Sequence, residues 1–190
     1  MLDTLERAEE LIYSDPAESL RLAERAEADP TLRVRAATVR AIALARQGDL
    51  VSSIGLGMQL LEEDMPASQR ARLLNVMGAA RDLLGQTEVA AELFARALAL
   101  DPPTELEAKL RVNLGVALAR LDRHEDALRH LHAAVHLTES PARMARIRLD
   151  MAISQRALGD LAAAGRTWTR RRPSRRTRRR PCWWPRSARC

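Results

Sequence analysis

Four short segments with similar sequences recur along the chain at a constant spacing. Gly48, Gly85, Asp122 and Gly159 lie 37 residues apart, and each has similar neighbours rich in Ala, Leu and Arg. A constant period of about 20 to 50 residues indicates stacked structural repeats, in which each unit packs only against its neighbours. The spacing therefore predicts a repeat array before local propensities are considered. It also directs the search for function toward the surface that such an array presents.

The repeated units are predicted to be helical. Apolar residues follow a helical period rather than an alternating one, and proline or glycine interrupts them at regular intervals. The expected helices span residues 3–12, 17–28, 31–47, 50–63, 68–84, 87–100, 104–121, 125–137 and 142–158. Because the connections are only a few residues long, successive helices are expected to run antiparallel as hairpins. The predicted fold class is all-α, with helical hairpins stacked as a solenoid.

Residues 71–104 carry a pattern of large, small and proline positions at Leu74, Met77, Gly78, Gly85, Ala90, Phe94, Ala97 and Pro102. This pattern resembles a tetratricopeptide (TPR) repeat, and the next unit repeats it at Leu114, Gly115, Ala127, Leu131 and Ala134. Gly78 and Ala90 are expected to let two helices approach closely, and Phe94 to fill the space between repeats. The resemblance implies a right-handed TPR-like solenoid of four to five hairpins over residues 1–164, with the last hairpin incomplete.

In proteins of the TPR family, the first helices of successive hairpins line a concave groove. The second position of each unit is basic here, at Arg35, Arg72, Lys109 and Arg146. The resemblance assigns the groove to Arg35, Thr38, Ile42, Arg46, Arg72, Asn75, Lys109, Val112, Asn113, Val116, Arg120, Arg146, Ile153 and Arg156. An apolar floor with a basic edge favours a protein or peptide segment that bears acidic side chains or a terminal carboxylate. A solvated arginine-rich helix face is the alternative interpretation.

The sequence shows no constellation typical of catalysis or of cofactor binding. There is no glycine-rich phosphate loop, no nucleophile elbow and no isolated pair of carboxylates in an apolar setting. His124, His130, His132 and His136 cluster in one segment, and the last two would share a helix face. No thiol or carboxylate completes a metal site there, so exposed helical histidines are the expectation. We expect a non-enzymatic protein-interaction module without metal or cofactor.

The charge is divided unevenly along the chain. The net charge is +6, yet residues 1–164 contain 20 basic and 25 acidic residues, whereas residues 165–190 contain 11 arginines and no acidic residue. All three tryptophans and both cysteines also lie in this arginine-rich segment, residues 165–190. The chain has no apolar run of membrane-spanning length, and its N-terminus does not resemble a secretory signal. A cytoplasmic protein without a membrane span is therefore expected.

Three interpretations of the arginine-rich segment remain open. It could bind nucleic acid through phosphate contacts, it could be a disordered appendage, or it could be the product of a frame shift in a GC-rich gene. A frame shift would leave the last hairpin incomplete and expose an apolar helix face, which favours self-association. It would also allow the chain to be the sensor part of a longer bacterial signalling protein that has lost a cyclase, kinase or DNA-binding output domain.

Overall fold

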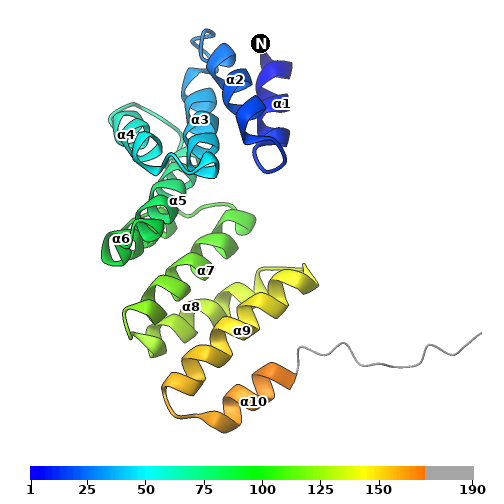
Figure 1. Cartoon of the computed structure of the whole chain (residues 1–190), viewed down its shortest axis with the longest axis vertical. Coiled ribbons are helices and arrows are strands. Elements are labelled where there is room, and N and C mark those ends of the chain that lie inside the picture. The colour runs from blue at the N-terminus through cyan, green and yellow to red at the C-terminus, as the bar shows by residue number, and fades with distance from the viewer. Residues whose placement is uncertain (170–190) are drawn as a thin grey trace, which may run out of the picture.

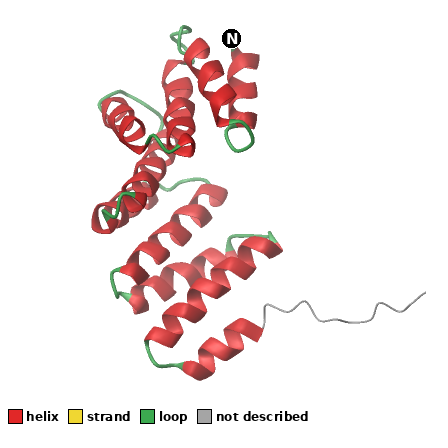
Figure 2. Cartoon of the chain, in the orientation of Figure 1, coloured by secondary structure: helices red, strands yellow, loops and turns green. Residues whose placement is uncertain are grey.

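The computed structural model describes residues 1–169, which form helices and short connections without a strand (Figure 2). The helices are α1 (Leu2–Leu11), α2 (Pro16–Ala26), α3 (Arg33–Gln47), α4 (Leu50–Leu61), α5 (Ala67–Leu83), α6 (Thr87–Leu98), α7 (Thr104–Arg120), α8 (His124–His136), α9 (Pro141–Ala157) and α10 (Leu161–Thr169). Each consecutive pair packs as a hairpin, and the hairpins stack from α1 at one end to α10 at the other (Figure 1). The all-α, right-handed TPR-like solenoid is confirmed. Among residues 1–169, none of the helices combines the length and the hydropathy of a membrane-spanning segment.

The residues of the 37-residue spacing occupy matching bends within four hairpins. Gly48 follows α3, Gly85 follows α5, Asp122 follows α7 and Gly159 follows α9. All four have a positive φ, at 89°, 78°, 57° and 81° respectively. This left-handed conformation reverses the chain after a helix and is easiest for glycine, while aspartate tolerates it better than most residues. The spacing in the sequence therefore reflects one bend that recurs at each step.

Small residues let the two helices of each hairpin approach closely. A Cβ atom added to Gly115 of α7 would stand 2.8 Å from Cγ of Leu131 in α8, so no larger residue fits without a shift. In the first two hairpins the second helix carries a buried serine that hydrogen-bonds to the first helix. The hydroxyl of Ser19 donates a hydrogen bond to the carbonyl of Ala8 at 2.7 Å, and that of Ser53 donates to Ala41 at 2.7 Å. The repeat pattern predicted a small residue on the second helix, as at Ala90 and Ala127, but it did not predict this hydrogen bond.

The hydrophobic core follows the stack from one hairpin to the next. One cluster joins α1, α2 and α3, the largest joins α3 to α8 around Phe94 and Leu74, and a third joins α7, α8 and α9. The first helices of neighbouring hairpins also contact one another directly, from α1 to α3 and onward to α9, whereas the second helices do not within residues 1–169. The first helices therefore form the inner, concave side of the array, as the TPR resemblance implied.

The last helix extends beyond the boundary expected at residue 164. Helix α10, described as Leu161–Thr169, packs along α9, so part of the arginine-rich segment belongs to the fifth hairpin. Some apolar surface remains at this end, because Ile153, Leu158 and Leu161 are 46%, 46% and 69% exposed. Self-association through this end stays a prediction. Residues 170–190, and with them most of the segment considered for nucleic-acid binding, lie outside the described residues.

Candidate functional site

Two adjoining pockets lie on the inner side of the array. The N-terminal pocket, of about 540 Å³, is lined by residues of α1, α3, α5 and α7, including Arg35, Ile42, Arg72 and Glu105. The C-terminal pocket, of about 270 Å³, is lined by residues of α5, α7 and α9 and by Thr138 of the connection before α9. Tyr13, Asn75 and Lys109 line both pockets. The shared residues show that the two pockets are parts of one groove, which we call the inner groove.

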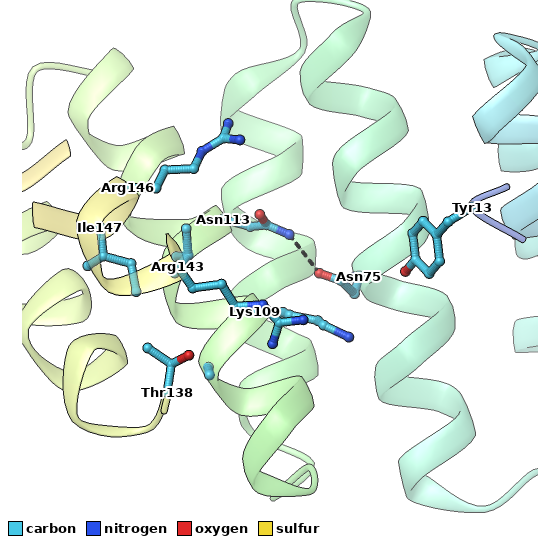
Figure 3. A pocket seen from close by; sticks show the side chains of 10 residues that line it. Tyr13, Asn75, Lys109, Asn113, Thr138, Arg143, Arg146 and Ile147 are labelled. Carbon is cyan, nitrogen blue, oxygen red and sulfur yellow. Dashed lines mark hydrogen bonds between the residues drawn. The ribbon is translucent and has the colours of Figure 1, made fainter. Parts of the chain in front are cut away.

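The C-terminal pocket combines an apolar floor with a basic rim (Figure 3). Ala108, Val112 and Ile147 provide aliphatic surface, and Ile147 is only 3% exposed. Lys109, Arg143 and Arg146 supply three positive charges, and among residues 1–169 no acidic side chain lines the pocket. A cavity of this kind suits an apolar side chain with a carboxylate beside it, since the floor is apolar and the rim can donate charged hydrogen bonds.

The basic residues of the inner groove differ in how far they are already neutralised. Arg35 donates two hydrogen bonds to Glu9, at 2.8 and 2.5 Å, so its charge is compensated. Lys109 pairs with Glu105 at 3.0 Å, and that carboxylate also lies 3.7 Å from Arg143. Within residues 1–169, Arg72 and Arg146 form no ion pair. The positive character of the groove is therefore concentrated toward α5, α7 and α9.

Two asparagines meet across the floor between α5 and α7. The Nδ2 atom of Asn113 donates a hydrogen bond to Oδ1 of Asn75 at 2.9 Å, and both side chains line the C-terminal pocket (Figure 3). Each amide retains hydrogen-bonding capacity beyond this contact, because an asparagine side chain offers two donor hydrogens and an acceptor oxygen. The pair can therefore bind the main chain of an extended ligand while it holds the two helices in register.

Tyr13 is a groove residue that the sequence analysis missed. It follows α1, yet it lines the C-terminal pocket together with residues of α7 and α9. Figure 3 shows it on the far side of Asn75 from Ile147 and Arg146. The guanidinium carbon of Arg46 lies 5.0 Å from the centre of its ring, a distance that suits a cation–π contact. Tyr13 is the only tyrosine of the chain, and it is 68% exposed. The signal in the sequence that could have indicated its role was an aromatic residue in a turn between two predicted helices.

The structure places some of the expected groove residues in these pockets and the others elsewhere. Arg35, Ile42, Arg72, Asn75, Lys109, Val112, Asn113 and Arg146 line the inner groove. Thr38 differs most from expectation, because it is 3% exposed and its hydroxyl donates to the carbonyl of Val34 at 2.8 Å. Arg120 pairs with Asp82 at 2.5 Å, and Arg46 contacts Tyr13 from outside both pockets. Val116, Ile153 and Arg156 line neither pocket.

Asp150 of α9 is a half-buried carboxylate close to the basic rim. Burial raises its pKa above the ordinary value, although the charge of Arg146 opposes this effect. Its Oδ2 atom is buried and has no hydrogen-bond partner among the described residues. Burial of an incompletely paired carboxylate is unfavourable when the group is ionised. Ionised Asp150 is therefore expected to be unfavourable to folding, and its negative charge opposes the positive charge of Arg146.

The four histidines lie on α8, the second helix of its hairpin, and none lines the inner groove. His130 is half-buried, and its pKa is lowered by burial and by the neighbouring Arg111, Arg129 and Arg123. The positive charges of these three arginines disfavour a metal cation at the imidazole of His130. Among residues 1–169, no group of three or more His, Cys, Asp or Glu side chains has an arrangement that could hold a metal ion.

Comparison with known proteins supports the fold without assigning a family. No protein-family model matches the sequence, and no curated protein matches it. The structure is similar to the crystal structure of BtubC from P. vanneervenii, with a TM-score of 0.68, 18% identity, and 90% of this chain and 86% of the other covered. It is also similar to MamA, with a TM-score of 0.67, 16% identity and coverages of 83% and 86%. For residues 41 to the end of MamA from Desulfovibrio magneticus RS-1, the TM-score is 0.66 at 17% identity, with coverages of 88% and 93%. These likenesses show that the chain has a TPR-like helical repeat fold.

Proposed function

We propose that the chain is a non-catalytic interaction module that binds an acidic or carboxylate-bearing peptide segment in its inner groove. One observation carries the proposal. The groove places apolar floor residues beneath a basic rim, and Arg72 and Arg146 have no ion-pair partner within the described part of the chain. A groove of connected pockets suits a segment of chain better than a compact small molecule.

The electrostatic balance of the groove supports an anionic ligand. Five basic side chains, Arg35, Arg72, Lys109, Arg143 and Arg146, line the two pockets, against the two carboxylates Glu9 and Glu105. A bound carboxylate would reduce the mutual repulsion of the remaining cations and gain charged hydrogen bonds. The apolar floor would contribute to affinity by burying an aliphatic side chain of the ligand, at roughly 25 cal/mol for each Å² removed from water.

Selection from a displayed library of random peptides tests the proposal. Peptides that bind the full chain should be enriched in Asp and Glu next to Leu, Ile or Val. Combined charge reversal at Arg72→Glu and Lys109→Glu should weaken their binding by about tenfold or more, because like charges would then face each other. Arg96→Glu on α6 is the matched control, since this arginine is exposed and lines neither pocket. Selected peptides without acidic enrichment, or equal losses for both variants, would contradict groove binding.

A further inference from the structure

Glu105 lies where the two pockets of the inner groove meet. It belongs to the first turn of α7, and it lines the N-terminal pocket next to Lys109, which lines both. Its Oε1 atom is 3.0 Å from Nζ of Lys109 and 3.7 Å from Nη1 of Arg143. One carboxylate oxygen of the protein thus bridges a lysine of α7 and an arginine of α9 at the basic rim.

These two cations are among the three, with Arg146, that line the C-terminal pocket and can contact a carboxylate above its apolar floor. Lys109 and Arg143 both line the C-terminal pocket beside Ala108, Val112 and Ile147. A second carboxylate at the same cations would be repelled by Glu105, because like charges at a short distance disfavour each other. A ligand carboxylate and Glu105 therefore cannot both make their best contacts with Lys109 and Arg143.

Glu105 is also able to leave this position. Its side chain is 70% exposed, and that of Lys109 is 41% exposed, so the pair is surrounded by water on one side. Ion pairs of this exposure contribute little to stability, and the glutamate can turn into solvent without leaving a buried charge. The hydrogen bond and charge of Lys109, followed by the charges of Arg143 and Arg72, lower the pKa of Glu105. The carboxylate is therefore ionised at neutral pH and held by the rim that would receive the ligand.

We propose that Glu105 is an internal competitor for the ligand carboxylate, which occupies Lys109 and Arg143 in the free protein and must be displaced on binding. This inference rests on the proposed function of the inner groove. Glu105 would then lower the affinity of the groove for a carboxylate ligand, whereas an ordinary groove residue raises the affinity for its ligand. Removal of its charge should strengthen the binding of a carboxylate ligand.

A small probe separates this effect from the rest of the peptide. N-acetyl-leucine carries one aliphatic side chain for the floor and one carboxylate for the rim, and N-acetyl-leucinamide is the same molecule without the charge. The dissociation constant of each is measured by NMR titration of the full chain, for the wild type, for Glu105→Gln and for Glu88→Gln. Glu88 is the matched control, because it lies exposed in the first turn of α6 and lines neither pocket.

Glu105→Gln should bind N-acetyl-leucine about two- to fivefold more tightly than the wild type, the factor that corresponds to one exposed ion pair. Glu88→Gln should bind as the wild type does, and the affinity for the amide should not change with either variant. If the wild type binds the acid but Glu105→Gln binds it equally or more weakly, the competitor role is wrong and the proposed groove function stands. If neither the wild type nor Glu105→Gln binds the acid, the pocket does not receive carboxylates, and the groove function and the competitor role are both overturned.

Discussion

Gly78 of α5 lies directly against the ring of Phe94 in α6, and a Cβ atom at Gly78 would stand 2.6 Å from Cε1 of that ring. Phe94 is 2% exposed and belongs to the largest core cluster, so the ring has little space into which it could move. The contact connects a small residue in the repeat pattern to the packing of two helices. The identity of one glycine is thus determined by an aromatic residue 16 positions later in the sequence.

This contact predicts that Gly78→Ala destabilises the fold, by about 1 to 3 kcal/mol, as expected for overpacking in a core. Alanine favours helices over glycine by about 1 kcal/mol, so helix propensity alone predicts the opposite sign. Gly55→Ala is the matched control, since Gly55 also lies inside a helix but an added Cβ would meet nothing within 4 Å. The free energy of unfolding in urea should fall for Gly78→Ala and rise for Gly55→Ala. A gain in both variants would show that the close approach is not limiting.

At Asp122, in contrast, a substitution by glycine is predicted to stabilise the fold. Asp122 has a φ of 57°, and the equivalent positions are occupied by glycines, Gly48, Gly85 and Gly159. A left-handed conformation costs a residue with a Cβ about 1 to 2 kcal/mol, and somewhat less for aspartate. Asp122→Gly should therefore raise the thermal midpoint slightly, by up to about 1 kcal/mol in stability. Asp122→Ala should lower it, since alanine adopts the left-handed conformation less readily than aspartate. Equal effects of both substitutions would indicate that the bend is not strained.

The sequence predicted most of the fold because the features that determine it are local and repeated. Each bend needs a residue that accepts a positive φ, and each close helix pair needs a small residue, so Gly85 and Ala90 mark their positions without knowledge of the partner. The last helix was harder to predict. The segment after Ala164 is rich in arginine and threonine and lacks a clear apolar stripe, yet the structure describes a helix over Leu161–Thr169, and this helix packs on α9.

The groove was predicted less completely, since the curvature of the stack decides which side chains converge. A constant repeat frame assigned Thr38 and Asn75 to equivalent positions, but Thr38 is buried and Asn75 lines both pockets. The position of Tyr13 in the C-terminal pocket could not be predicted from the sequence of its own repeat, because most residues of this pocket belong to α7 and α9. Contacts between distant hairpins depend on small rotations that accumulate from one repeat to the next, and no single residue records them.

Substitution of Asp150 by asparagine should change the stability of the fold in a pH-dependent way. Its pKa in the folded state is raised by burial, relative to about 3.9 in an unfolded chain. A raised folded-state pKa means that the carboxyl is favourable to folding below its unfolded pKa, and that this contribution is lost as the pH rises through the folded pKa. Asp150→Asn should therefore increase the thermal midpoint at pH 7, and the gain should shrink toward pH 3. Asp64→Asn, at an exposed position, should show no such trend. A gain that is constant with pH would assign the effect to packing instead of charge.

Substitution of Tyr13 by alanine should lower the affinity for the ligand without lowering the stability of the fold. Its ring is exposed and lies outside the core clusters, so Tyr13→Ala should leave the thermal midpoint nearly unchanged. The same substitution removes an aromatic wall of the C-terminal pocket and should weaken binding of a selected acidic peptide about fivefold, a change of about 1 kcal/mol. Tyr13→Phe retains the ring and should bind nearly as the wild type does. A full loss in Tyr13→Phe would instead assign the effect to the hydroxyl.

Salt dependence and deletion should distinguish peptide binding in the inner groove from nucleic-acid binding by the arginine-rich segment. Deletion should begin at residue 170, because Leu161–Thr169 forms α10 and covers part of α9. Binding of a selected acidic peptide should survive this deletion, since both pockets are lined by residues before 148. Binding of single-stranded DNA, if the full chain shows it, should weaken steeply between 50 and 200 mM salt and disappear on deletion, because phosphate contacts release counterions. Peptide binding that disappears with residues 170–190 would place the ligand site in the deleted segment and contradict the inner groove. DNA binding that persists would instead require the helical array itself to contact phosphates, for which the exposed arginines of α7 and α9 are the first residues to substitute.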